Sequence, residues 1–445
     1  MRIESRSAAW FVVLILATTG CVPVPVSTVP LHPRQERPVS AESVTSPNSG
    51  IYSALAFDAS GTLLAAYDSG EDRVRILRGA DLTTADSLEP SHWPRRLGFS
   101  PGGRFLVIET HQGWVEDFLR IGTSWPGAPI NSAAAFLDDI QRVEVWNLRT
   151  GQTTPNLSCD AVGVREPVGG WLWAKNMATA PGYRSSAILA AHFSADERIF
   201  SVLCWNGVRQ RWDSGTWTRL ADIPPPPFWN DLMGLTTARW LAQDDAASQS
   251  ADGRITILRV REKSIGFPTT YLWDQGTTLA RPVPGDCATR LQPVQALSHD
   301  GNRIVAVCNK GIGHAIRAWD LAVGREFPLR DAEFGFSRGA PVVRGAGVAL
   351  SPDGRHVAVA LLEQVEALVA GPLPTAGLAI SRSDLRLWSL DSGKELVALS
   401  LDDMVVAGDY FRGVDLAISP DSAMLAVGGR RIRLYRMNDL TGDSP

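Results

Sequence analysis

The stretch GVALSPDGRHVAVALL (347–362), followed by LRLW at 385–388, decides the fold. It combines an apolar strand, a Ser-Pro-Asp-Gly turn, a second strand of small and branched residues, and a third strand that alternates. Proline fixes φ for a turn, and Asp or Gly tolerates the backbone conformation that follows, so this chemistry closes a tight connection between antiparallel strands. The unit therefore predicts one small antiparallel sheet.

Related units follow one another from Ile51 onward. Their turns begin at Asp58, Ser100, Ser194, Ser298, Ser351 and Ser419, and a degraded copy lies near Gln243-Asp244-Asp245. A large residue recurs at one place in each third strand, at Leu77, Trp146, Trp212, Leu258, Trp319, Trp388 and Tyr435. Alternation puts every second residue of a strand on one face, so these residues are structural anchors. Seven anchors predict an all-β repeat body over residues 49–440, with a short tail at 441–445.

Strands that end in Trp212-Asp213 or Trp319-Asp320 resemble the third strand of a WD-repeat blade. The Ser-Pro-Asp-Gly turns resemble that family's connection between first and second strands, although its Gly-His dipeptide is missing from nearly every repeat. The resemblance covers roughly Ile51 to Asn438 and implies a seven-bladed β-propeller. Such a ring usually closes with strands from both chain ends. Since about ten residues follow Tyr435, we expect part of 30–46 to supply the outer strand of the last blade.

Residues 1–20 are typical of an export signal. Two arginines precede an apolar run from Ala8 to Ala17 that is too short to span a bilayer. The sequence Thr18-Thr19-Gly20-Cys21 resembles a bacterial lipobox, with Thr18 where Leu is usual, and implies lipidation of Cys21. The alternative is an ordinary secretory signal with a chance cysteine. The Pro-rich segment 21–48 predicts an extended tether, and Val22 resembles lipoproteins sent to the outer membrane, so we expect the body in the periplasm.

Composition argues against several functional classes. The 43 basic and 47 acidic residues are scattered, with no long Lys/Arg run, so we expect no nucleic-acid partner. No C-x-x-C, H-E-x-x-H or phosphate-binding loop is present, so we expect neither metal nor cofactor. The segment 98–102 matches G-x-S-x-G, but its Ser100 begins a repeat turn and indicates architecture rather than a nucleophile. No catalytic residue is assigned, and we expect a monomer.

Long insertions gather on the predicted face that holds the links between blades and the turns between second and third strands. Blade six, for example, inserts 363–381 there. The candidate binding residues of this face are Trp114, Trp125, Trp171, Trp173, Phe228 and Trp229. Aromatic side chains dominate interface energetics, so this concentration indicates a recognition surface. The alternative is that these loops pack on one another and roof the channel.

Four cysteines besides Cys21 suggest disulfides in an exported chain. Cys204 and Cys308 end equivalent second strands, and Cys159 and Cys287 lie in the loops leading into those blades. We therefore predict the pairs Cys159–Cys204 and Cys287–Cys308; free buried thiols are the alternative.

Two functions fit these features. The first is a non-enzymatic, membrane-anchored scaffold that binds a protein or peptide through the aromatic insertions. The second is a propeller enzyme or small-ligand binder, such as a hydrolase or lactonase, that uses the central channel. The second function requires convergent polar residues from several first strands, whose inward positions read mostly as small or apolar.

Overall fold

The computed structural model describes most of the repeat body. The described residues are 43–46, 51–92, 94–111, 138–139, 141–154, 157–159, 162–163, 184–185, 188–204, 206–229, 247–250, 253–260, 269–274, 277, 280–283, 295–310, 313–334, 342–369, 375–404 and 414–442. Cys21, the segment 1–42 and the last three residues lie outside them, as do several insertions.

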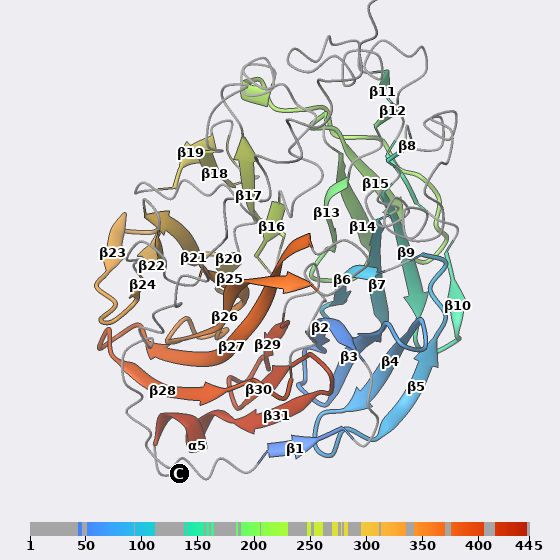
Figure 1. The fold of residues 1–445 in the computed structure, drawn as a ribbon. Helices are drawn as coiled ribbons and strands as arrows, with labels where there is room; N and C mark the ends of the chain where they lie inside the picture. The colour runs from blue at the N-terminus through green and yellow to red at the C-terminus, as the bar shows by residue number, and fades with distance from the viewer. Residues whose placement is uncertain are drawn as a thin grey trace, which may run out of the picture.

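Within the described residues, seven antiparallel sheets follow one another along the chain (Figure 1). Sheet 1 contains β2 (Tyr52–Phe57), β3 (Leu63–Asp68), β4 (Arg73–Arg78) and β5 (Thr84–Leu88). Sheet 2 contains β6 (Pro94–Phe99), β7 (Phe105–His111), β9 (Gln141–Asn147) and β10 (Gln152–Thr153). Sheet 3 contains β13 (Ile188–Phe193), β14 (Ile199–Cys204) and β15 (Arg209–Asp213). Sheet 4 contains β16 (Ala247–Gln249), β17 (Ile255–Val260), β18 (Thr269–Asp274) and β19 (Ala280–Pro282).

The remaining strands complete the series. Sheet 5 contains β20 (Gln295–Leu297), β21 (Arg303–Lys310), β22 (Gly313–Asp320), β23 (Arg325–Phe327) and β24 (Glu333–Phe334). Sheet 6 contains β25 (Val342–Leu350), β26 (His356–Val369), β27 (Thr375–Ser389) and β28 (Glu395–Ser400). Sheet 7 contains β29 (Leu416–Ile418), β30 (Met424–Val427), β31 (Arg433–Arg436) and β1 (Ser43–Thr45), and a short helix, α5 (Met437–Thr441), follows it. A further small sheet joins β8 (Asp138–Asp139), β11 (Val162–Gly163) and β12 (Arg184–Ser185).

One hydrogen-bonded turn joins the first two strands in every one of these seven sheets. In sheet 6, Ser351 Oγ accepts a hydrogen bond from the backbone N–H of His356 at 2.8 Å and donates to Asp353 Oδ1 at 2.5 Å. The serine is completely buried, so the bond to the backbone satisfies a group that water cannot reach. The fourth turn residue always has a positive φ, from +57° to +72°, at Gly61, Gly103, Glu197, Gly253, Gly301, Gly354 and Ser422.

The sheets are arranged around a ring that the chain termini close. Strands β13, β16, β20, β25, β29 and β2 each contact the next along this sequence, and β2 contacts β6. Strand β1 pairs with β31 in the register Ser43↔Tyr435, and Ser46 N–H donates to the carbonyl of Ile432 at 2.9 Å. This pairing agrees with the expectation that a segment before residue 46 supplies the outer strand of the last sheet. The architecture is all-β and is consistent with the β-propeller class.

Buried side chains fill the seams between neighbouring sheets. Five of the predicted anchors are buried: Leu77, Trp212, Trp319, Trp388 and Tyr435. Trp146 is partly buried and packs against the cluster between sheets 1 and 2. Trp388, for example, lies in the cluster between sheets 5 and 6 and donates from Nε1 to the carbonyl of Arg330 at 3.0 Å. A large residue at this position therefore joins each sheet to the one before it.

Sheet 4 corrects the predicted anchor. Leu258 lies in the second strand, β17, where it pairs with Tyr271, and the third strand is β18 with Trp273 at the anchor position. The first turn of this sheet begins at Ser250, whose Oγ accepts from Ile255 N–H at 2.9 Å. The predicted anchor therefore lies one strand too early in this sheet, and the degraded turn predicted near residues 243–245 lies outside the described residues.

No helix in the described part of the chain is both long enough and apolar enough to cross a membrane.

Candidate functional site

The insertion face is the side of the ring that carries the turns between second and third strands and the links between sheets. In sheet 6 this side is extended, because β26 and β27 stay paired from His356↔Ser389 to Val369↔Thr375. The equivalent hairpin of sheet 1 pairs only six residues on each strand. Residues 363–369 and 375–381 therefore continue two strands, and these strands curve toward the middle of the molecule in Figure 1.

Insertions from two repeats also pair with each other. Strand β8 belongs to the connection between β7 and β9, whereas β11 and β12 belong to the link into sheet 3. Arg184 pairs with Asp138 in parallel, and Val162 pairs with Ser185 in antiparallel fashion. These pairings join the connections of neighbouring repeats into one layer.

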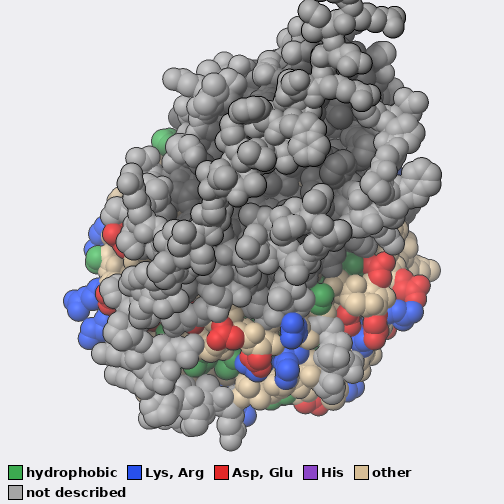
Figure 2. Space-filling view, in the orientation of Figure 1, with side chains coloured by type: hydrophobic (Ala, Val, Ile, Leu, Met, Phe, Trp, Pro, Cys, Tyr) green, Lys and Arg blue, Asp and Glu red, His purple; other side chains and the backbone are tan. Residues whose placement is uncertain are grey.

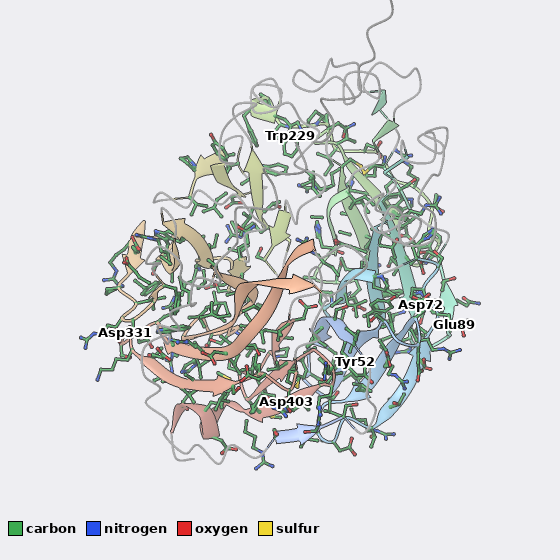
Figure 3. All side chains as sticks on the ribbon, viewed as in Figure 1. Tyr52, Asp72, Glu89, Trp229, Asp331 and Asp403 are labelled. Atoms are coloured by element: carbon green, nitrogen blue, oxygen red, sulfur yellow. A yellow bond between two sulfur atoms is a disulfide. The ribbon has the colours of Figure 1, made fainter. Side chains whose placement is uncertain are left out.

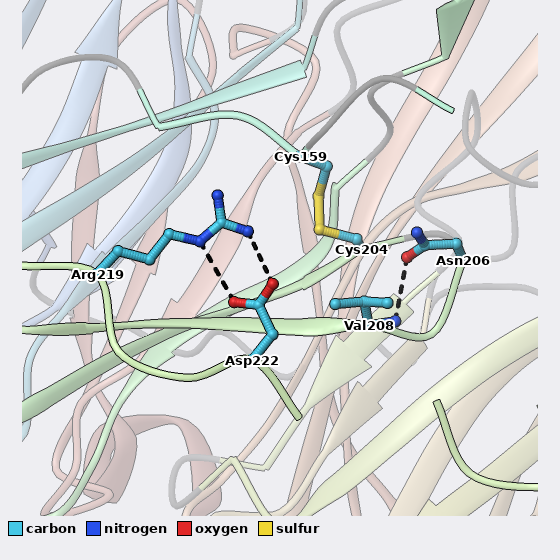
Figure 4. The surroundings of a disulfide bond; sticks show 6 residues. All are labelled: Cys159, Cys204, Asn206, Val208, Arg219 and Asp222. Atoms are coloured by element: carbon cyan, nitrogen blue, oxygen red, sulfur yellow. Dashed lines mark hydrogen bonds and ion pairs between the residues drawn. A yellow bond between two sulfur atoms is a disulfide. The ribbon is translucent and has the colours of Figure 1, made fainter. Parts of the chain in front are cut away.

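A disulfide fixes the link to sheet 3, as predicted. The Cys159 and Cys204 sulfurs are bonded, their Cα atoms lie 5.7 Å apart, and both residues are at most 3% exposed (Figure 4). The tight turn that follows Cys204 is closed by Asn206, whose Oδ1 accepts from Val208 N–H at 3.1 Å. Cys308 is also disulfide-bonded, and its predicted partner Cys287 lies outside the described residues.

The aromatic residues predicted for the binding face divide into two groups. Trp114, Trp125, Trp171 and Trp173 lie outside the described residues. Phe228 is partly buried, and Trp229 is 1% exposed, so Trp229 is corrected from a surface contact to a core residue. Figure 3 shows Trp229 near the end of the molecule that carries sheets 3 and 4. The ring of Trp229 packs against strands of sheets 3 and 4.

Trp229 and Phe228 fill the seam between sheets 3 and 4. The ring centroid of Trp229 lies 5.7 Å from that of Trp273, and the Phe228 centroid lies 5.7 Å from the same ring. Gly207, with φ +80°, makes room for this packing, because a Cβ there would lie 2.6 Å from the Trp229 ring. Arg209 stands two residues after Gly207, with its guanidinium carbon 5.7 Å from the Trp273 centroid. The seam therefore combines three aromatic rings with a cation.

A second polar site lies between sheets 2 and 3. A cavity of 260 Å³ there is lined by the side chains of Arg96, Glu109 and His192 together with apolar residues that include Phe99 and Phe193. Arg96 and Glu109 are cross-strand neighbours, with Nη1 3.9 Å from Oε2. His192 packs against Gly253 of the next sheet, where an added Cβ would lie 2.3 Å from the imidazole ring. This volume is slightly below the range typical of drug-sized ligands and suits a small molecule.

Neither the seam nor the cavity contains the ligand set of a metal ion. Among the described residues, no three His, Cys, Asp or Glu side chains are grouped to hold one. On the part of the surface that is coloured in Figure 2, basic and acidic side chains are interspersed along the lower rim. The charged and imidazole side chains at these two sites are Arg209 in the seam and Arg96, Glu109 and His192 in the cavity.

Comparison with known proteins identifies no relative: the chain matches no protein-family model and no curated protein.

Three residues of these sites went unpredicted from the sequence. Trp273 is followed by Asp274, the same dipeptide that marks Trp212 and Trp319, so this signal was available. Arg209 and Arg96 stand in strands where the repeat expects apolar or small residues, but that contrast requires the correct register in every sheet. Both arginines could therefore be found in the sequence only as exceptions to the residue type that the repeat has at their positions, and not through a motif.

Proposed function

We propose that this chain is a seven-bladed WD-type β-propeller, anchored through lipid at Cys21, that works as a non-enzymatic protein-binding platform in the bacterial cell envelope. The partner is a protein or peptide, and the insertion face receives it. The placement of the body in the periplasm rests on the export signal and on the residues around Cys21.

The asymmetry between the two faces of the ring carries this proposal. On one face, the first turns are short and alike, and neighbouring turns contact each other, as where Gly102 N–H donates to Glu197 Oε1 at 2.6 Å. On the other face, the chain adds the long β26–β27 hairpin, the small β8–β11–β12 sheet and the Cys159–Cys204 disulfide. Elaboration that is confined to one face of a rigid scaffold is typical of a recognition surface.

Crosslinking and affinity capture of the full chain from cells test the platform. A variant that lacks residues 114–139 should lose a defined partner. Val323→Asp serves as the control, because Val323 is 70% exposed in the turn between β22 and β23, on the opposite face, and should retain the partner. Both variants must melt as cooperatively as the wild type. Capture that is unaffected by the deletion, or lost in Val323→Asp, argues against the insertion face.

The alternative function, a small-ligand binder or enzyme, has one specific observation in its favour. The cavity between sheets 2 and 3 brings Arg96, Glu109 and His192 together beside the first strands β6 and β13. A cation, a carboxylate and an imidazole are groups that orient a polar ligand or transfer a proton. Loss of a captured small molecule in Glu109→Gln, with protein capture unchanged, would favour this function.

A further inference from the structure

The third strand of sheet 3 departs from the repeat at two core positions. These positions lie one and three residues before the anchor and face the next sheet, as Val143 and Val145 do toward Phe193 and Phe200. The equivalent residues in the other sheets are Val74 and Ile76, Val143 and Val145, Thr270 and Leu272, Ile316 and Ala318, Leu385 and Leu387, and Ile432 and Leu434. Apart from Thr270, all are apolar and at most 3% exposed. Sheet 3 has Arg209 and Arg211 there.

Arg209 has no acidic partner among the described residues. Its Nε is buried and makes no hydrogen bond, and its guanidinium carbon lies over the Trp273 ring. Burial lowers the pKa of Arg209, and the charge of Arg211 lowers it further. Arg211 donates from Nε and Nη2 to the carbonyl of Ala221, at 3.1 and 2.9 Å. Contact with an aromatic face returns only part of the free energy that a guanidinium loses on leaving water.

Four other third-strand arginines of this chain pair with carboxylates. Arg75 lies 3.0 Å from Asp68, Arg317 lies 2.7 Å from Glu326, and Arg386 lies 3.4 Å from Glu395. Arg433 pairs with Asp403 in the same manner. Each of these arginines stands two residues before an anchor, at a position that is polar in most sheets. Arg209 is therefore exceptional in both its position and its surroundings.

We propose that Arg209 and Arg211, with Trp273 as an aromatic wall, form a binding site for an oxyanion, either a carboxylate or a phosphate group. The planar guanidinium presents paired N–H donors that match both groups, and a second arginine adds positive charge at the same seam. The ligand supplies the negative charge that the chain itself supplies for Arg75, Arg317, Arg386 and Arg433. The site adjoins Gly207 and Trp229 on the insertion face, and it does not depend on whether that face binds a protein.

Thermal unfolding of the full chain in detergent tests the site. Succinate and inorganic phosphate are compared with chloride at equal ionic strength, since a ligand that binds only the native state raises the melting temperature. The wild type should gain about 2 °C or more with at least one of the two anions. Arg209→Leu, which restores the residue type of the other sheets, should melt higher than the wild type in chloride and should lose the response.

Two further variants separate binding from general effects of charge. Arg209→Gln keeps a polar side chain and should also lose the anion response. Arg317→Leu removes one positive charge from the third strand of sheet 5 and should keep the full response. A response to succinate alone identifies a carboxylate ligand, and a response to phosphate alone identifies a phosphate ligand.

Three results would overturn the site. The first is an unchanged melting temperature of the wild type in both anions. The second is an equal response in Arg209→Gln and the wild type. The third is a lower melting temperature of Arg209→Leu in chloride, which would make Arg209 a structural residue that stabilises the seam through Trp273.

Discussion

At the scale of single residues, the repeat is defined by backbone conformation as much as by side chains. The fourth residue of each first turn has a positive φ, and five of the seven are glycines. Glu197 and Ser422 are the exceptions, and the Glu197 side chain has a second role because it accepts a hydrogen bond from Gly102. Ser422 has φ +59°, and only its backbone N–H takes part in the turn, through the carbonyl of Ser419 at 2.8 Å. Strain at Ser422 therefore has no visible compensation within the turn.

Ser422→Gly should raise the free energy of unfolding by about 0.5 kcal/mol. A left-handed conformation costs an L-residue roughly 1–2 kcal/mol, and the greater freedom of glycine in the unfolded chain offsets about 0.5–1 kcal/mol of that gain. Denaturant titration measures the difference. Gly61→Ser is the matched control, because φ is +72° and the nearest atom to an added Cβ is 3.5 Å away. It should lower the free energy of unfolding by a similar amount. If both variants changed the free energy of unfolding in the same direction, the explanation by backbone strain would be wrong.

The turn aspartates make stability dependent on acid. Burial raises the pKa of Asp300 and of Asp353, but hydrogen bonds from Ser298 and Ser351 outweigh it and leave both values lowered. Because the folded pKa lies below the unfolded value of about 3.9, the stabilisation is fully present above about pH 4 and is lost as pH falls through the folded pKa. The double variant Asp300→Asn/Asp353→Asn should be less stable than wild type near neutral pH. In denaturant titrations, the difference in the free energy of unfolding between the two proteins should narrow below about pH 4. A difference that does not change with pH would show that the ionised carboxylates do not stabilise the turns.

At the scale of elements, strong turn signals made most strands predictable. The Ser-Pro-Asp-Gly turn and an alternating strand ending in a large residue both act locally, so sheets 1, 5 and 6 follow from their own sequence. The prediction for sheet 4 is wrong because residues 255–258 alternate like a third strand, while the two polar threonines at the start of β18 obscure Trp273. The turn at Ser250 and the dipeptide Trp273-Asp274 together resolve the register, whereas either signal alone is ambiguous.

The candidate sites were less predictable than the strands. The Cys159–Cys204 pair followed from equivalent positions in the repeat, because these positions place the two cysteines on adjacent elements, as the short Cα separation of a disulfide requires. The burial of Trp229 did not follow, because it depends on the space that Gly207 leaves in a seam between two sheets whose residues are distant in the sequence. The position of Arg209 in the seam could not be predicted either, because a charged residue in an alternating strand is ordinarily assigned to the solvent side.

At the scale of the whole molecule, ring closure joins the two ends of the repeat body. Tyr52 N–H donates to the carbonyl of Gly429 at 2.7 Å, and the backbone N–H of Ala54 is bound by the Asp415 carboxylate. Strand β1 adds the outer edge of sheet 7, so Ser43–Thr45, within the segment 21–48 that was predicted as a tether, is part of the folded body. A pull on the tether would therefore act directly on the closing sheet.

Removing β1 should destabilise the entire ring rather than one edge. A chain that begins at Pro47 lacks the pairing of Ser43–Thr45 with β31 and the bond from Ser46 to Ile432, whereas a control that begins at Ser43 keeps both. At about 1 kcal/mol for each hydrogen bond, the shorter chain should melt lower by on the order of 5 °C, and the control should melt like the body of the full chain. Val44→Pro provides a milder variant, because proline removes a backbone donor without shortening the strand. If the chain beginning at Pro47 melts with the control in calorimetry, then sheet 7 is complete without β1, and the tether is mechanically independent of the ring.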